Sequence, residues 1–331
     1  MSEKEQAAQI DETAKVFGEF LKTLTVGELE THDNLTIFPV FTTTPQKNGY
    51  SLLDEAVKTG KFTVTEVTEG GSVPNLKVEN GLDQDVLILD GDILIGAKQN
   101  RSVTTTIIIG RKSKSVIDVN CVERGRWSYK GRNFTASEQP MYSTLRATKS
   151  RSVNYSLKEN RSFAADQGKV WEDINQKSIR FSMADEGFKA SSTEAADEMY
   201  ASYEDRIKAY ESSFKPREGQ VGFVVLIDGK VVGCDIFGNP GVLNRAFGKG
   251  IRSYILDAIE KSFDKNKKAP VGDSRKKAVA FLASVGKLKP EVFPSTGKGM
   301  SIRFEGKSSN GFAALDGDQV VHLAAFHDVR D

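Results

Sequence analysis

Four consecutive polar residues hold the side chains best suited to binding an anion or a sugar. They are Lys98, Gln99, Asn100 and Arg101, and they follow the small residues Gly96 and Ala97. An arginine fork matches a phosphate or a carboxylate, and side-chain amides pair with sugar hydroxyls or with the edge of a base. Small residues before them allow close approach of a ligand or of another backbone. The run predicts a ligand-binding site, although an ordinary surface turn has the same composition.

A second polar run begins at Cys121 and includes Glu123, Arg126 and Trp127. A thiol among cations can have a lowered pKa and act as a nucleophile. Free cysteine is also often a core residue, and alternation with Val119 would place Cys121 in the core. Glu123 is a candidate general base and Arg126 a candidate phosphate ligand. Trp127 would either stack on a ring of the ligand or fill the end of a strand.

Asp235 is a third candidate catalytic residue, because it lies inside an apolar strand. A buried carboxylate demands a partner, and Arg245, Arg252 or a ligand hydroxyl could supply it. His322 also lies within an apolar strand, where a satisfied interior histidine and a catalytic base are both tenable interpretations.

No well-understood catalytic, cofactor or metal motif accompanies these residues. Segments 295–299 and 247–250 resemble pieces of a phosphate loop, but the leading glycine of a P-loop is missing at the required spacing. The sequence contains neither His-Glu-x-x-His nor Gly-x-Ser-x-Gly. No ligand spacing predicts a metal site, no cofactor is identified, and catalysis itself is an open question.

Short strands separated by Gly, Asp and Asn turns occupy the region that contains both polar runs. They are predicted at 35–41, 62–67, 75–78, 86–89, 93–95, 102–109 and 115–122. Spacing this regular predicts an antiparallel sandwich or a barrel-like sheet. Asp-Gly pairs that begin at 90, 228 and 316 predict hairpin turns. Because successive strands usually neighbour each other, we expect Arg101, Glu123 and Arg126 to converge on one site.

Apolar residues at helical spacing predict helices near 9–26, 52–58, 169–181, 192–213, 241–264 and 274–285. The polar stretch from Trp127 to Asn160 lacks that periodicity and is predicted to be a functional loop or lid. The fold class is α+β, with an N-terminal antiparallel β-sandwich or barrel-like sheet, a helical middle, and C-terminal hairpins plus helices. The expected divisions are an N-terminal amphipathic helix (1–33), a β-rich lobe (34–135), a polar loop and helical segment (136–218) and an α/β C-terminal lobe (219–331). One integrated domain is the alternative.

Composition indicates an ordinary globular protein, with 331 residues of which 38% are hydrophobic and 27% charged. Two cysteines, Cys121 and Cys234, cannot build a disulfide framework. The chain shows no secretory signal and no apolar run near the roughly 20 residues of a membrane span. We therefore expect a cytoplasmic protein without a membrane partner.

Charge is distributed unevenly along the chain. Between residues 96 and 161, fourteen Lys or Arg stand against four acids, whereas the whole chain carries a formal net charge of +1. This asymmetry indicates an anionic partner, unless acidic helices balance the cations in space. Nucleic acid is one such partner, because Tyr129, Phe134, Tyr142 and Tyr155 are interleaved with the basic residues.

Three segments together resemble a known family. The run from Asp90 to Arg101, the motif from Cys121 to Trp127, and the later segment from Gly233 to Phe237 are similar to the bacterial ADP-ribosylglycohydrolase- and rhodanese/phosphatase-associated protein domain. The resemblance extends from near Asn34 to the C-terminal hairpin. It implies a role near NAD or ADP-ribose metabolism, by genomic association, and supplies no catalytic roles.

The sequence therefore favours a cytoplasmic protein that binds or processes a small phosphorylated ligand related to ADP-ribose or NAD. Arg101 and Arg126 would hold phosphate, the two amides before Arg101 would contact hydroxyls, and Glu123 or Asp235 would be the general base if a reaction occurs. The alternative is a non-catalytic interaction module whose basic face binds nucleic acid or an acidic protein. The oligomeric state is left open.

Overall fold

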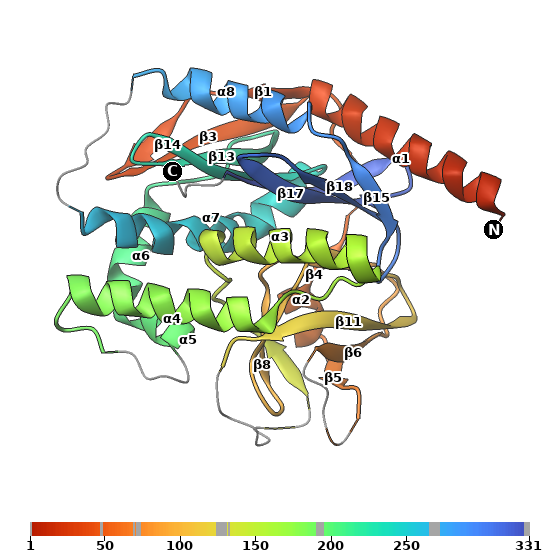
Figure 1. Cartoon of the computed structure of the whole chain (residues 1–331), viewed down its shortest axis with the longest axis horizontal. Coiled ribbons are helices and arrows are strands. Elements are labelled where there is room, and N and C mark those ends of the chain that lie inside the picture. The colour runs from red at the N-terminus through yellow and green to blue at the C-terminus, as the bar shows by residue number, and fades with distance from the viewer. Residues whose placement is uncertain are drawn as a thin grey trace. The chain divides into compact units, whose positions relative to one another are not determined.

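The computed structural model describes residues 2–46, 49–68, 70, 74–123, 131, 133–189, 195–264 and 272–327 (Figure 1). The chain forms two compact units, each assembled from segments that are distant in the sequence. Unit 1 comprises 1–49, 213–247 and 265–331, and unit 2 comprises 50–212 and 248–264. Helix α7 (Pro240–Ser262) contributes residues to both.

Unit 1 is built on a nine-stranded sheet in the order β1-β3-β13-β14-β18-β17-β16-β15, with β2 paired to β3. Its strands are β1 (Leu24–Val26), β2 (Glu30–His32), β3 (Leu35–Thr42), β13 (Gln220–Ile227), β14 (Lys230–Phe237), β15 (Glu291–Pro294), β16 (Met300–Glu305), β17 (Ser309–Asp316) and β18 (Gln319–His327). Two predicted hairpin turns are confirmed. Asp228 and Gly229 have φ values of 50° and 68° between β13 and β14, and Gly317 has a φ of 60° between β17 and β18.

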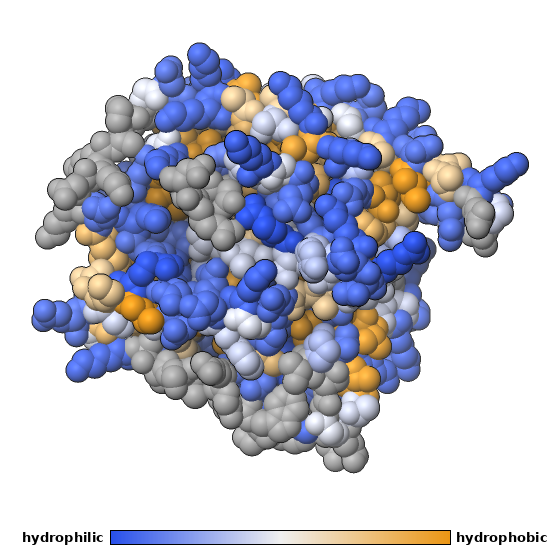
Figure 2. Space-filling model, viewed as in Figure 1, coloured by the Kyte–Doolittle hydropathy of each residue, from blue (hydrophilic) through white to orange (hydrophobic). Residues whose placement is uncertain are grey.

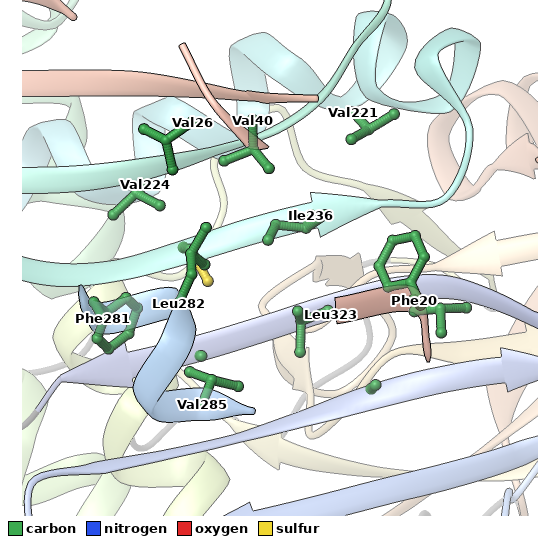
Figure 3. Packing of buried hydrophobic residues seen from close by; sticks show 14 of the residues in the cluster. Phe20, Val26, Val40, Val221, Val224, Ile236, Phe281, Leu282, Val285 and Leu323 are labelled. Atoms are coloured by element: carbon green, nitrogen blue, oxygen red, sulfur yellow. The ribbon is translucent and has the colours of Figure 1, made fainter. Parts of the chain in front are cut away.

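Helices α1 (Glu3–Lys22) and α8 (Ser274–Val285) pack on one face of this sheet. Phe20 of α1 joins Phe281 and Val285 of α8 in a buried cluster with sheet residues such as Val224 (Figure 3). Helix α1 starts and ends earlier than predicted. A capping box at Ser2 begins it, and the apolar residues after Lys22 belong to strand β1 instead.

Unit 2 contains a six-stranded antiparallel sheet in the order β12-β8-β9-β11-β6-β5. Its strands are β5 (Phe62–Glu66), β6 (Asn75–Asn80), β8 (Ile93–Gly96), β9 (Arg101–Val103), β11 (Ser113–Cys121) and β12 (Phe134–Ala136). A bridge between Thr65 and Asn133 connects the two edges, so the sheet nearly closes on itself. This arrangement confirms the α+β class with a barrel-like sheet, which we call the barrel.

A smaller sheet and a short helix complete the apolar core of unit 2. They are β4 (Ser51–Leu52), β7 (Val86–Ile88), β10 (Ile107–Ile109) and α2 (Leu53–Lys58). Leu53, Val86 and Ile107 lie in one buried cluster with Val64 and Val119 of the barrel. Because β7 and β8 belong to different sheets, the turn at Asp90 and Gly91 is not the predicted hairpin turn but a connection between sheets.

The remaining helices of unit 2 are α3 (Ser143–Asn160), α4 (Gln167–Ala184), α5 (Ala195–Ser202), α6 (Glu204–Ser212) and the later part of α7. The prediction of a loop or lid up to Asn160 was wrong, because α3 fills residues 143–160. Its buried face is largely polar, with Arg146, Lys149, Ser150 and Asn154, so it lacks the apolar period of an ordinary helix.

The face seen in Figure 2 is mainly hydrophilic, with hydrophobic residues scattered among the polar ones. Scattered apolar side chains are normal on protein surfaces. Within the described residues, none of the helices combines the length and the apolar character that crossing a membrane requires.

Candidate functional site

Three strands of the barrel end at the same rim. In an antiparallel sheet every second strand runs in the same direction, so β5, β11 and β8 finish together. Both polar runs identified from the sequence begin there. Cys121 ends β11, Arg101 opens β9, and the two residues are direct partners in the ladder. The structure thus places the start of the second run beside the end of the first.

The inward face of the barrel changes from apolar to polar at this rim. Side chains two residues apart along a strand share a face. Strand β5 contributes Val64 to the apolar core and then Glu66, and β9 contributes Val103 after Arg101. Residues of this region form the polar end of the barrel, which we define as Glu66, Lys98, Gln99, Arg101, Cys121 and Glu123.

Arg101 and Glu66 are the most unusual pair in the polar end of the barrel. The side chain of Arg101 is 0% exposed, its Nη1 donates to Gln99 Oε1 at 3.1 Å, and its Nη2 lies 3.9 Å from Glu66 Oε1. The Glu66 side chain is 5% exposed, and within the described structure neither of its oxygens accepts a hydrogen bond. A buried acceptor left without a donor costs about 1–3 kcal/mol. This carboxylate therefore has acceptor capacity that the fold leaves unused.

Asn100 positions the polar residues around it. Its backbone amide donates to Glu123 Oε2 at 3.0 Å, and its carbonyl accepts from the amide of Val122 at 3.1 Å. Its side chain accepts from the amide of Gly96 and donates to Asp197 of α5, both at 3.3 Å. These four bonds occupy the backbone and the side-chain amide. Asn100 is thus better suited to fixing the turn than to contacting a ligand hydroxyl.

The two small residues before the run serve a backbone contact. Gly96 has a φ of 133°, and a Cβ atom there would lie 2.8 Å from the carbonyl oxygen of Asn133. Only glycine fits both conditions. Ala97 has a φ of 39°, a strained conformation for a residue with a side chain. The close approach that the sequence predicted is made here by the backbone next to β12.

Lys98 and Cys121 complete the polar end of the barrel. Lys98 is buried, and its ammonium donates to the carbonyl of Gly70 after β5. Burial raises the pKa of the Cys121 thiol, an effect that Arg101 opposes and the carboxylates of Glu66 and Glu123 reinforce. A thiol with a raised pKa stays protonated at neutral pH and lacks the thiolate that a nucleophile needs. The geometry therefore argues for Cys121 as a buried structural residue.

The other candidates named from the sequence do not join this set. Asp235 belongs to unit 1, where its Oδ1 lies 3.0 Å from Nε2 of His322. One partner of Asp235 is this interior histidine, which stacks on Phe237 with ring centroids 4.5 Å apart. Arg126 and Trp127 lie outside the described residues.

Sequence reasoning missed a second buried polar group in unit 2. Asp90 accepts from Arg146 Nε at 2.9 Å and lies 3.5 Å from Lys149 Nζ, while Asp92 pairs with Lys249 at 2.6 Å. Burial lowers the pKa of Lys149, and Asp90 opposes that shift. The spacing of the polar residues on α3 was the available signal. Glu66 was also missed, although it continues the alternating pattern of β5.

The described residues contain no group of three or more His, Cys, Asp or Glu placed to hold a metal ion. None of the curated proteins and none of the solved structures compared with this chain matches it. One family model does, and it covers residues 23–326. The chain therefore belongs to the family of the ARG and Rhodanese-Phosphatase-superfamily-associated Protein domain.

Proposed function

We propose that the polar end of the barrel binds a small phosphorylated ligand related to ADP-ribose or NAD. The observation that carries the proposal is the buried pair of Arg101 and Glu66, which lie 3.9 Å apart without a hydrogen bond between them. The two oxygens of Glu66 accept no hydrogen bond within the described structure, and a buried acceptor left unsatisfied calls for an explanation such as a bound ligand. Arg101 supplies a fork for phosphate, and Lys98 adds a second cation in the same region. The ADP-ribose connection comes from the genomic association for which the family is named.

If the ligand is also processed, Glu66 is the carboxylate best placed to act as the general base. A base needs an oxygen that can accept a proton. Glu123 already accepts a hydrogen bond from the backbone amide of Asn100. Asp235 is paired with His322 in unit 1. Glu66 has both oxygens available for this role.

The contacts give less support to the alternative, a basic face for nucleic acid or an acidic protein. Among the cations between residues 96 and 161 that the structure describes, Lys98, Arg101, Arg146 and Lys149 are buried. A buried cation paired with protein acceptors cannot neutralise the phosphates of a long polymer. At the surface, Lys112 and Lys114 pair with Asp83 and Glu79.

A thermal-shift screen of ADP-ribose, NAD, AMP and adenosine tests the proposal. A ligand at 100 times its dissociation constant stabilises the native state by about 2.7 kcal/mol. We expect the phosphorylated compounds to raise the melting temperature and adenosine to raise it less. The absence of any shift with millimolar ADP-ribose and NAD would count against the proposed ligand class.

A further inference from the structure

The unused acceptor capacity of Glu66 limits what the ligand can present to it. An ionised carboxylate only accepts hydrogen bonds, and its two oxygens suit a group with two adjacent donors. A phosphate offers none, because its oxygens are acceptors. The ligand region that contacts Glu66 must therefore be a donor group that is separate from the phosphate.

The charge of Arg101 further limits which ligand group can donate hydrogen bonds to Glu66. Its guanidinium lies 3.9 Å from Glu66, and both side chains are buried, so the pair is close to neutral as a unit. A cationic donor would meet the arginine as a like charge at low dielectric, which is unfavourable. A neutral donor pair is therefore favoured over an ammonium or a guanidinium. If the two donors are hydroxyl groups, their oxygen atoms can also accept hydrogen bonds from Arg101.

We infer that Glu66 and Arg101 together recognise the vicinal diol of a ribose ring next to a phosphate. The two hydroxyls donate to Glu66, and the diol oxygens or the neighbouring phosphate accept from Arg101. This inference rests on the proposed function and specifies the sugar part of that ligand. It also assigns Glu66 as the residue that determines selectivity for ribose over deoxyribose.

Calorimetric titration with ribose 5-phosphate and 2-deoxyribose 5-phosphate tests the inference. The wild-type protein should bind the ribose compound about tenfold more tightly or better, as expected for a hydrogen bond to a charged group. Glu66→Gln replaces one acceptor oxygen with a donor, so the preference for ribose should fall to near unity. Glu79→Gln is the matched control, because it makes the same change at a half-exposed position of β6 in the same barrel.

The outcomes separate this inference from the proposed function. Equal affinity of the wild-type protein for the two sugars, or a ribose preference that survives in Glu66→Gln, would overturn the diol assignment and leave phosphate binding in place. Absence of binding by both compounds would overturn the diol assignment, whereas the thermal-shift screen with ADP-ribose and NAD decides the proposed function separately. The comparison of the two sugars on the wild-type protein needs no variant, so equal affinities would overturn the diol assignment even if Glu66→Gln folds poorly.

Discussion

Asn100 and Glu123 join the two polar runs, because the backbone amide of Asn100 donates to Glu123 Oε2 at 3.0 Å. The bond is buried and spans the turn between β8 and β9 and the end of β11. The structure therefore gives Glu123 a structural role, which is to hold the turn at Asn100 against the end of β11.

Two substitutions at Glu123 separate these roles. Glu123→Ala leaves the buried amide of Asn100 without its acceptor and should lower the free energy of unfolding by about 1–3 kcal/mol. Glu123→Gln keeps an acceptor oxygen and should lower the free energy of unfolding clearly less than Glu123→Ala does. Urea denaturation of both variants measures the difference. Equal losses in the two variants would show that the charge of Glu123, rather than its acceptor atom, supports the fold.

Removal of Arg101 should destabilise the protein strongly, because it leaves Glu66 buried without its cation. We expect Arg101→Met to lower the free energy of unfolding by about 3–5 kcal/mol. The double variant Arg101→Met with Glu66→Leu should recover much of that loss, since an apolar pair replaces the buried charges. Arg111→Ala, at an exposed turn, is the control and should stay within about 0.5 kcal/mol of wild type. A double variant no more stable than Arg101→Met would contradict the coupling.

The sequence predicted where the polar residues of this site lie along the chain, but not that they are buried. Polar side chains immediately after apolar strands identified both the Lys98–Arg101 run and the Cys121 run, and Arg101 and Cys121 are indeed neighbours in the sheet. Exposure was harder to infer. A turn of four polar residues is normally at the surface, yet residues 98–101 are all buried, because the neighbouring chain segments cover them with hydrogen-bond partners.

Tertiary contacts explain the larger misses. Helix α3 could not be predicted from apolar periodicity, because Arg146 and Lys149 face the interior, where Asp90 compensates their charge. The pairing of β3 with β13 joins residues far apart in the sequence, so no local sequence pattern could predict that these two strands are neighbours. Hairpins such as β13–β14 were predictable, because the Asp228-Gly229 turn fixes them locally.

Cys121 should react slowly in the native protein. Burial raises the pKa of its thiol and also blocks access of a reagent. We expect iodoacetamide at pH 7 to label Cys121 only on the timescale of unfolding, as followed by peptide mass spectrometry. Val116→Cys introduces a thiol at a 47% exposed position of the same strand and should react quickly. Equally rapid labelling of Cys121 would restore it as a candidate nucleophile.

Asp257 should make the stability of the protein depend on acid pH. Burial would raise the pKa of its carboxyl, but the charge and hydrogen bond of Lys177 and the bonds from Ser143 and Thr144 outweigh burial, so the pKa is lowered from 3.8. A lowered pKa means that the carboxylate stabilises the folded state above its unfolded pKa and loses that contribution as pH falls through the folded pKa.

The variant Asp257→Asn tests this dependence. At pH 7 it should lower the free energy of unfolding by about 3 kcal/mol, because Lys177 loses a buried partner. The gap between wild type and variant should narrow as pH falls below about 4. Denaturant unfolding between pH 7 and pH 3 gives the comparison. A gap that stays constant over this range would show that Asp257 titrates equally in the folded and unfolded states.

Hydrogen–deuterium exchange with and without saturating ADP-ribose tests the central claim most directly, because it reports where the ligand binds without altering any residue. Peptides that cover 94–103 and 117–123 should exchange more slowly in the complex, since ordering at the polar end of the barrel reduces local opening. Peptides from the β13–β14 hairpin in unit 1 serve as the internal control and should be unchanged. If ADP-ribose raises the melting temperature but leaves 94–103 and 117–123 unprotected, the ligand binds elsewhere and the proposed site is wrong.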